Sequence, residues 1–428
     1  MTMTKKTPRH VVISHAYSKN NKGDAALLSV LISEVRRKFN PGKITVLTID
    51  RTFAGETFED VQVEHAFMYF ANFRFNAKPA KFLYGVYIMS STLLWAHAYR
   101  LLGIRLPLPT RIRKIMDIYA DADLVVGVGG GYIRSQPDYA SMYNLFLLAH
   151  PLYVSAALRQ PAMLHAQSFG PFYHRIEKRL MRRTLNNKVG AIIIREHKSA
   201  DLLRSIGVTR EIHKSVDAGF LFKTDKRMHV RKRFGWDAKQ LVVGITVRQW
   251  LAPDKQAAYE AAIARLADYL VKAYGAKVLF IPQVTVEFHR DDDRVVGQRI
   301  LARIRHKKSV EVLLENYDHY EIKALYKELD FIVGTRFHSI IFSLTEYVPA
   351  LAIEYEHKTS GIMRDLGLEE WTIKIEDVTA DKLITRVDAL IAHKDEYRRQ
   401  LRERLPAYID QAAHAIDIIA DAYDAAQK

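Results

Sequence analysis

The stretch FIVGTRFHSIIFSL, Phe331 to Leu344, places Arg336 and His338 between two apolar runs. The first run, Phe331–Gly334, is short, rich in β-branched residues and closed by a glycine, which predicts a buried strand. A guanidinium removed from water without a partner costs on the order of several kcal/mol, so a core has no use for an unpaired arginine. Either a buried group neutralises these side chains, or they meet a ligand.

The same alternation of strands and helical patterns extends outward from this stretch over the whole chain. Amphipathic segments separate most of the strands, an order typical of parallel sheets covered by helices. The sequence therefore predicts an α/β protein with two Rossmann-like domains facing a cleft. The predicted strands are Val11–His15, Lys43–Ile49, Val61–Glu64, Leu124–Val128, Ala162–Gln167, Ala191–Arg195, Leu241–Val247, Lys277–Pro282, Val310–Leu314, Phe331–Gly334 and Ala350–Glu354.

A length of 428 residues is sufficient for two domains. The stretch Phe222–Gln240 is basic and poor in apolar residues, and we interpret it as the linker. This predicts an N-terminal domain of residues 1–225, with an apolar insertion near residues 80–105, and a C-terminal domain of residues 226–428. The last helices are candidates for packing back on the N-terminal domain.

The net charge of +16 implies attraction to an anionic partner. No arginine-glycine tract, zinc-ligand cluster or RNA-binding aromatic signature accompanies the charge, so we expect no nucleic-acid partner. The absence of cysteine excludes disulfides and thiolate metal sites and fits a reducing compartment. The basic N-terminus lacks the long apolar region of a secretory signal, so a cytoplasmic location is expected.

The segment Phe82–Ala98 is nearly uncharged and is flanked by lysines and arginines. It is a little short for a membrane span, which needs about 20 predominantly apolar residues. One interpretation is a buried helix or loop excursion. The other is an interfacial element on an anionic membrane surface, with the flanking cations on the lipid headgroups.

Ligands of open α/β sheets bind beyond the carboxyl ends of the strands, so the residues at those junctions are the candidate site. After the first strand come Asn21, Gly23 and Asp24. Asp24 either caps a helix that begins near Ala25 or accepts a ligand hydroxyl. Gly129 and Gly130 follow another strand, where glycines either expose backbone N–H groups to an anion or let strand and helix pack closely.

Four cationic residues fall at predicted strand ends: Arg195, Arg248, Arg336 and Lys358. Arginine presents a planar fork suited to carboxylate or phosphate, so several of them favour a small, multiply anionic ligand. A local pair with Glu196 is the simpler explanation for Arg195. The acidic run Asp291–Asp293 could hold a metal, but acids at a helix start more often complement the helix dipole, and no metal site is expected.

With these residues in view, the sequence resembles the polysaccharide pyruvyl transferase family. The matching elements are the Asn21–Asp24 loop, the strand and glycines of Asp123–Gly131, QSFGPF, REHKSADLL, GTRFHSIIFSL and AIEYEHKTSGIMRDLGL. The resemblance implies a glycosyltransferase-B-like fold, with the acceptor on the N-terminal domain and the donor motif on the C-terminal domain. It also implies that phosphoenolpyruvate is the co-substrate, with no further cofactor. The implied product is a pyruvate ketal across two hydroxyls of a sugar in a bacterial exopolysaccharide or its lipid-linked precursor.

The family motif for phosphoenolpyruvate, arginine-variable-histidine, falls on Arg336, Phe337 and His338. His338 is expected to protonate the C3 methylene of the donor, and Asp24 or Glu354 is expected to act as base or to orient the diol. A second donor arginine corresponds to Arg195, with Arg248 as the next choice. The complete predicted donor set is Arg336, Arg195, Arg248, Phe337 and Lys358, and the predicted acceptor set is Asn21, Gly23, Gly129, Gly130 and Glu354.

Two other functions fit the same features. A glycosyltransferase that uses nucleotide sugars also needs cationic side chains for a diphosphate. A non-catalytic sugar- or lipid-binding scaffold is the third possibility, although such a scaffold has no need of a histidine and arginines at strand ends. For a lipid-linked acceptor, we expect a protein peripheral to the inner face of the plasma membrane.

Overall fold

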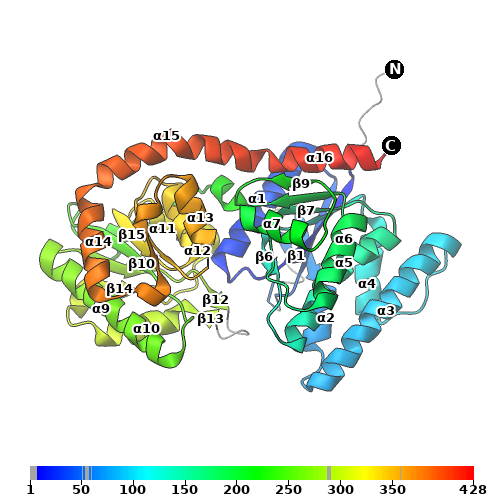
Figure 1. Cartoon of the computed structure of the whole chain (residues 1–428), viewed down its shortest axis with the longest axis horizontal. Helices are drawn as coiled ribbons and strands as arrows, with labels where there is room; N and C mark the ends of the chain where they lie inside the picture. The colour runs from blue at the N-terminus through cyan, green and yellow to red at the C-terminus, as the bar shows by residue number, and fades with distance from the viewer. Residues whose placement is uncertain (1–6, 51, 54–56, 59, 287–290, 357) are drawn as a thin grey trace. The chain divides into compact units, whose positions relative to one another are not determined.

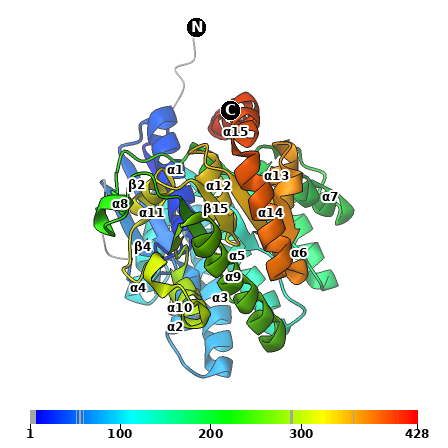
Figure 2. The same cartoon turned by 90° about the vertical axis from the view of Figure 1, so that its left-hand side faces the viewer.

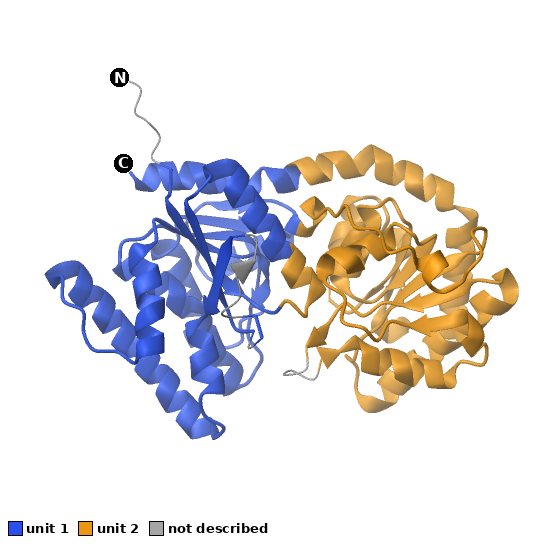
Figure 3. Ribbon diagram, turned by 180° about the vertical axis from the view of Figure 1, so that it is seen from behind, with its two compact units in different colours: residues 1–18, 27–218, 411–428 blue, residues 19–26, 219–410 orange. Residues whose placement is uncertain are grey.

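The computed structural model describes residues 7–50, 52–53, 57–58, 60–286, 291–356 and 358–428, and in it the chain forms two compact units (Figures 1 and 2). Unit 1 comprises the chain up to Ser18, Leu27–Ala218 and Gln411–Lys428. Unit 2 comprises Lys19–Ala26 and Gly219–Asp410 (Figure 3). Each unit has a mainly parallel sheet flanked by helices, as predicted for an α/β protein with two Rossmann-like domains.

Two segments differ from the predicted division at residue 225. Residues 19–26 cluster with unit 2, because the backbone N–H of Lys22 donates to the carbonyl of Gln283 and that of Thr285 donates to the carbonyl of Asn20, both at 2.9 Å. Residues 411–428 cluster with unit 1, where helix α16 (Ala415–Ala426) contacts strands β7 (Ala162–Phe169) and β8 (Ala191–Ile194). The chain therefore passes between the units several times.

The described strands of unit 1 form a nine-stranded sheet in the order β3-β4-β2-β1-β5-β7-β8-β9, with β6 paired to β7. Strand β3 is antiparallel to β4, and the other pairings among the described strands of this sheet are parallel. The remaining strands are β1 (His10–Ala16), β2 (Lys43–Thr48), β3 (Thr57–Phe58), β4 (Val61–His65), β5 (Leu124–Gly127), β6 (Gly130–Ile133) and β9 (Ile212–Lys214). The helices are α1 (Lys22–Phe39), which begins in unit 2, α2 (Phe67–Phe73), α3 (Lys78–Leu102), α4 (Thr110–Asp121), α5 (Tyr139–Ala157), α6 (Arg175–Asn187) and α7 (His197–Ser205).

The described strands of unit 2 form a parallel six-stranded sheet in the order β14-β11-β10-β15-β16-β17 and a small antiparallel pair, β12-β13. The strands are β10 (Val242–Thr246), β11 (Lys277–Phe280), β12 (Thr285–Val286), β13 (Asp291–Asp292), β14 (Val310–Val312), β15 (Phe331–Gly334), β16 (Ala350–Glu354) and β17 (Thr372–Lys374). The helices are α8 (Val230–Arg233), α9 (Pro253–Tyr274), α10 (Asp293–Arg303), α11 (His319–Tyr326), α12 (Phe337–Leu344), α13 (Lys358–Asp365), α14 (Ala380–Ala392) and α15 (Lys394–Ala413).

The central strands of both sheets are buried along their whole length. Every residue of β7 and β8 in unit 1, and of β10 and β15 in unit 2, is buried. Parallel sheets with helices on both faces require this, and it explains why these strands appear in the sequence as continuous apolar runs. In such a sheet the carboxyl ends of neighbouring strands lie at one edge, which brings distant parts of the sequence together.

The apolar segment Phe82–Ala98 lies in helix α3, which begins at Lys78 and ends where Gly103 adopts a left-handed conformation with φ of 70°. One side of α3 is buried, including Ile88, Thr92 and Trp95. The interpretation as a buried helix is therefore correct for this side only. No helix in the described part of the chain is long and apolar enough to cross a membrane.

Candidate active site

The carboxyl ends of β10, β15 and β16 bring together three of the predicted cationic residues. Strand β15 pairs with β10 on one side and with β16 on the other, and all three run parallel. Arg248, Arg336 and Lys358 follow these strands in that order. The candidate site is therefore this edge of the unit 2 sheet, as expected for an open α/β sheet.

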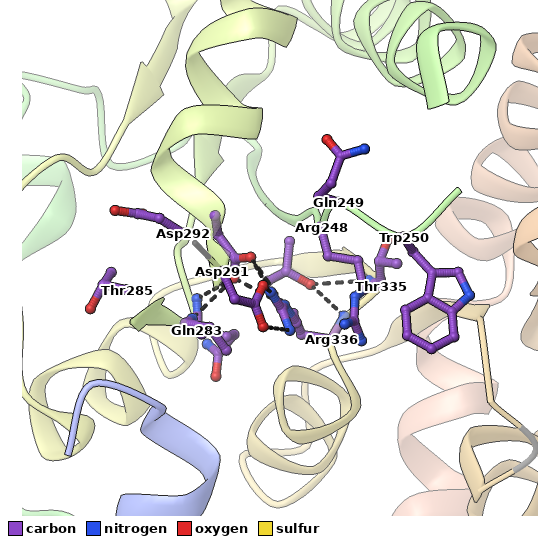
Figure 4. Close-up of polar contacts among 12 residues, drawn as sticks. Arg248, Gln249, Trp250, Gln283, Thr285, Asp291, Asp292, Thr335 and Arg336 are labelled. Carbon is purple, nitrogen blue, oxygen red and sulfur yellow. Dashed lines mark hydrogen bonds and ion pairs between the residues drawn. The ribbon is translucent and has the colours of Figure 1, made fainter. Parts of the chain in front are cut away.

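Arg336 is buried in an ion pair with two carboxylates (Figure 4). Its Nε and Nη2 donate to Asp293 Oδ1 at 3.0 and 2.6 Å, and its Nη2 also donates to Asp291 Oδ1 at 2.5 Å. Burial alone would lower the pKa of Arg336, but the charges of Asp293 and Asp291 outweigh it and the pKa is raised. Of the two alternatives stated for this side chain, the structure shows neutralisation by a buried group. Within the described residues, Arg336 is therefore a paired cation and not one that is open to a ligand.

The acidic run has two different tasks. The buried Asp293 accepts from Arg336 and also from the backbone N–H groups of Gln283 and Val284, at 2.9 and 3.0 Å. Burial raises the pKa of Asp293, and Arg336 opposes this shift. Asp292 caps α10 by accepting from the backbone N–H of Arg294 at 2.9 Å. The interpretation of these acids as partners of the helix dipole is thus incomplete, because Asp291 and Asp293 are the counter-charges of Arg336.

The backbone at Arg336 is fixed by the buried residue Thr246 at the end of β10. Its Oγ1 accepts from the N–H groups of Thr335 and Arg336 at 3.0 and 3.3 Å and lies 2.9 Å from Ser339 Oγ. The Thr335 hydroxyl in turn lies 2.8 Å from the hydroxyl of Tyr259 on α9. These bonds set where α12 begins, and therefore where its first residues, Phe337 and His338, are placed.

Arg248 differs from Arg336 in having no ion pair within the described parts of the chain. Its Nε is buried without a hydrogen-bond partner among the described residues. Its guanidinium carbon lies 4.1 Å from the ring centre of Tyr355 and 4.5 Å from that of Trp250. Burial and the neighbouring charge of Arg336 lower the pKa of Arg248. A partly exposed guanidinium with a buried, open Nε donor and aromatic faces beside it is suited to bind an anion.

His338 packs directly on the first turn of α1. A Cβ placed on Gly23 would lie 1.9 Å from His338 Nδ1, which no real contact allows, so only glycine fits here without moving the imidazole. The ring of Phe337 is 5.2 Å from that of His338 and lies 5.2 Å from Lys358 Nζ. The structure thus brings the predicted residues Gly23, His338, Phe337 and Lys358 into one neighbourhood of unit 2.

The Asn21–Asp24 loop is placed differently from the prediction. Helix α1 begins at Lys22 rather than near Ala25, and the Asn21 side chain accepts from the N–H of Asp24 at 3.4 Å. Asn21 therefore occupies the capping position, which was one of the two alternatives for Asp24, and Asp24 lies within the first turn. Asn21 also pairs with Val284, whose backbone N–H donates to Asp293.

The residues after β16 are engaged locally. Lys358 Nζ lies 2.9 Å from Glu356 Oε2, so this cation is paired with its neighbour. The hydroxyl of Ser360 donates to Glu354 Oε1. The side chains of Lys358 and Glu356 are partly exposed, at 18% and 19%. Water reaches this pair, so a ligand can replace Glu356 at low cost.

Three predicted residues, Arg195, Gly129 and Gly130, belong to unit 1. Arg195 is buried, donates through Nε to Ser168 Oγ at 2.8 Å and is paired through Nη1 with Asp217. The expected local partner Glu196 instead accepts from Ser199. Gly129 lies against the strand β7, since a Cβ there would be 3.0 Å from the carbonyl oxygen of His165. The glycine run therefore serves close packing, and a strand rather than a helix follows it.

Sequence reasoning missed the residues that surround the arginines. Asp291 and Asp293 were noted only as an acidic run, and the aromatic neighbours of Arg248, Trp250 and Tyr355, were not selected. The spacing of Arg248 and Trp250, two positions apart in VRQW, was a usable signal, because an aromatic side chain near an arginine at a strand end can form a cation–π contact. Within the described residues, no group of three or more histidines or acids is arranged to hold a metal ion.

Comparison with known proteins gives an independent line of evidence. A family model described as polysaccharide pyruvyl transferase matches residues 21–357, a span that contains the Asn21–Asp24 loop, Arg248 and the Arg336–His338 motif. The amylovoran biosynthesis protein AmsJ of Erwinia amylovora is 25% identical over 312 residues, which cover 69% of this chain and 72% of that protein.

The similar solved structures support the fold. The Anabaena protein HepE in complex with UDP-glucose has a TM-score of 0.56 at 13% identity, covering 96% of this chain and 98% of that chain. The UDP-GlcNAc 2-epimerase of Methanocaldococcus jannaschii has a TM-score of 0.53 at 11% identity, covering 89% and 91%. At these identities the likeness concerns the architecture alone, which is the glycosyltransferase-B-like arrangement of two Rossmann-like units.

Replacing Asp293 by asparagine tests the buried ion pair. Asp293→Asn leaves Arg336 buried with only the half-exposed Asp291 as its counter-charge, so the free energy of unfolding should fall by about 3 kcal/mol. Urea titration measures this loss. The matched control is Asp292→Asn, in which asparagine can still cap α10 and only a surface pair with Arg294 is lost, for an expected change within about 1 kcal/mol. Equal effects of the two substitutions would contradict the assignment.

Replacing Gly23 by alanine tests the contact with His338. The added methyl group should displace the imidazole and lower the free energy of unfolding by about 1–3 kcal/mol. The ring signals of His338 in an NMR spectrum should shift at the same time. The control is Gly361→Ala on α13, where a Cβ meets nothing within 4 Å and should stabilise the helix by about 0.5–1 kcal/mol. Unchanged His338 signals in Gly23→Ala would contradict the placement.

Proposed function

The chain belongs to the polysaccharide pyruvyl transferase family, and from this premise we propose that it transfers the pyruvyl group of phosphoenolpyruvate onto two hydroxyls of a sugar as a ketal. The acceptor is a sugar of a bacterial exopolysaccharide or of its lipid-linked precursor. The likeness to AmsJ, a protein of amylovoran biosynthesis, supports the polysaccharide setting. The observation that carries the proposal is that the family match includes Arg248, a partly buried arginine that has no ion pair among the described residues, together with Arg336 and Lys358 at the carboxyl edge of the unit 2 sheet.

The donor requires cationic partners, because phosphoenolpyruvate carries a carboxylate and a phosphate on three carbons. Arg248 is the proposed primary contact, since its fork has an unused buried donor and its charge is not balanced by a described carboxylate. Lys358 contributes by exchanging Glu356 for the donor, and the start of α12 adds the positive end of a helix dipole. Phe337 lies between Lys358 and His338 and provides an apolar wall.

Arg336 has a different part in this proposal. Its charge is already balanced by Asp291 and Asp293, so it holds the loop that carries His338 in place. It reaches the donor only if the half-exposed Asp291 gives way to an anionic group of the donor. Arg195 belongs to unit 1 and is paired with Asp217, and its place in the donor set stays a prediction from the sequence.

The proposed reaction begins with proton transfer from His338 to the C3 methylene of phosphoenolpyruvate, which forms a methyl group and leaves C2 electron-poor. One sugar hydroxyl adds to C2 and its proton returns to the imidazole. The bond between C2 and the phosphate oxygen then breaks, phosphate leaves with the electron pair, and the second hydroxyl adds to C2. The proton of that second hydroxyl goes to the base and from there to phosphate, so the products are the ketal and inorganic phosphate.

Asp24 is the proposed base, because it lies one residue from the glycine that contacts the imidazole. Glu354 is the alternative carboxylate. The acceptor contacts are proposed at Asn21 and Gly23 beside the histidine and at Glu354, all in unit 2. For Gly129 and Gly130 of unit 1, the acceptor role stays a prediction from the sequence. No other cofactor is part of the proposed reaction.

The role of His338 is tested by His338→Gln. Phosphate release from phosphoenolpyruvate, measured with a panel of oligosaccharide and lipid-linked acceptors, should fall about 100-fold or more, because a general acid contributes roughly 10²–10⁴. In D2O the wild-type ketal methyl group should carry one solvent deuterium. Full phosphate release by His338→Gln would refute the acid role. Turnover of a nucleotide sugar in place of phosphoenolpyruvate would instead identify a glycosyltransferase.

The role of Arg248 is tested by Arg248→Met, which keeps the apolar stem and removes the charge. The loss of a charged hydrogen bond to the donor should cost about 1.5–3 kcal/mol, or roughly 10- to 150-fold in kcat/KM for phosphoenolpyruvate. The matched control is Arg265→Met on α9, an exposed arginine paired with Asp381, which should leave kcat/KM unchanged. An unchanged kcat/KM in Arg248→Met would remove Arg248 from the donor site.

A further inference from the structure

Helix α3 carries an apolar stripe that faces solvent. Leu83, Leu94 and Leu101 are 66%, 63% and 72% exposed, and Phe82, Val86 and Tyr87 on the same helix are also exposed. The three leucines are separated by eleven and seven residues, which places them on one side of a helix. Singly exposed apolar residues are ordinary, but a continuous stripe of this kind usually marks an interaction surface.

The opposite side of α3 is packed firmly on unit 1. Ile88 and Trp95 are fully buried, and Thr92 Oγ1 lies 2.8 Å from Nε2 of the buried His150 on α5. Gly85 approaches Tyr143 so closely that a Cβ there would overlap the tyrosine hydroxyl. Figure 1 shows α3 at the outer side of the helices of unit 1. The stripe is therefore held in place on the surface by a buried, specific inner side.

The charge on α3 and on the segments beside it is mostly positive, although Lys114 and Arg105 pair with Glu64 and Asp117. Residues 65–116 contain no aspartate or glutamate, and their eight cations are Arg74, Lys78, Lys81, Arg100, Arg105, Arg111, Arg113 and Lys114. The part of the stripe from Phe82 to Leu94 lies between the cations that precede Phe82 and those that begin at Arg100. Arg74 and Arg105, near the two ends of α3, lie over the rings of Tyr84 and Tyr99 at 5.4 Å.

We propose that this face of α3, the stripe with its flanking cations, docks the protein on the surface of an anionic lipid bilayer. The apolar side chains enter the boundary between headgroups and acyl chains, and the lysines and arginines contact the anionic headgroups. The helix lies along the surface, because its inner side is occupied by unit 1 and no described helix is long and apolar enough to span a membrane. This surface goes beyond the proposed reaction and requires neither its donor nor its acceptor.

A second copy of the chain is a less suitable occupant. A symmetric dimer through this face would place one mainly cationic surface against an identical one, and like charges would repel. The attraction of this charge to a bilayer grows with the fraction of anionic lipid, since each cation near such a surface contributes on the order of 1 kcal/mol. Charge complementarity therefore favours the bilayer.

Flotation of the full chain with vesicles tests the proposal. The protein should float with vesicles of phosphatidylcholine and phosphatidylglycerol in equal parts at least about tenfold more than with phosphatidylcholine alone, and high salt should reduce this binding. The variant Leu83→Ser/Leu94→Ser should lose about tenfold or more of the binding. Its matched control, Leu314→Ser/Val295→Ser, alters similarly exposed side chains of unit 2 and should float like the wild type.

Three results would overturn the proposal: equal flotation on both vesicle types, full binding by the α3 variant, or a lipid-free dimer in sedimentation that the α3 variant alone dissociates. Thermal unfolding checks that both variants fold, which is expected because the substituted side chains are exposed. Phosphate release without lipid should be the same in both variants and the wild type. Failure of flotation and failure of the proposed reaction are therefore separate outcomes.

Discussion

The arrangement of the candidate site depends on the buried ion pair between Arg336 and Asp293. Asp293 accepts from Arg336 and from the backbone of Gln283 and Val284, so it joins the end of β15 to the segment that follows β11. Val284 pairs with Asn21, and Gly23, two residues on, contacts His338, which is itself two residues from Arg336. This chain of contacts thus begins at Arg336 and returns, through His338, to the same helix start. A buried ion pair is weak evidence for net stability, and here its evident effect is positional, because it determines where the imidazole lies.

This constraint changes how the two arginines should be understood. A guanidinium that is already held by two carboxylates gains little from one more anion, since binding must first displace a partner. Arg248 has no such partner among the described residues. It has a buried, unused Nε donor, and partial burial and the charge of Arg336 lower its pKa. An anion bound at Arg248 would offset both the cost of burial and the repulsion from Arg336. The motif arginine therefore organises the site, and an arginine outside the motif has the electrostatic reason to bind the donor.

Much of the fold was predictable because parallel strands buried on both faces leave a plain apolar signature. The predicted strands Phe331–Gly334 and Ala350–Glu354 have the observed bounds. The site was predictable only as a set of strand ends. Asp293 lies 43 residues from Arg336, and the contact of Gly23 with His338 joins opposite ends of the family match. These contacts are set by the tertiary structure, so the spacing of the residues in the sequence does not predict them. The start of α1 was misplaced because Asn21 and Asp24 are equally competent caps, and Arg195 found Asp217 instead of the adjacent Glu196.

Two separate groups of positive charge matter for the two proposals, one in each unit. Eight cations gather in residues 65–116, in unit 1, while Arg248, which has no ion pair among the described residues, belongs to unit 2. At physiological ionic strength charges are screened over about 8 Å, so exposed cations act only on what lies directly beside them. A donor with several negative charges would also be depleted near an anionic membrane. Under the two proposals made above, the enzyme therefore needs a separate cation in its donor site, and the partly buried Arg248, whose Nε is buried, is the side chain proposed for that part.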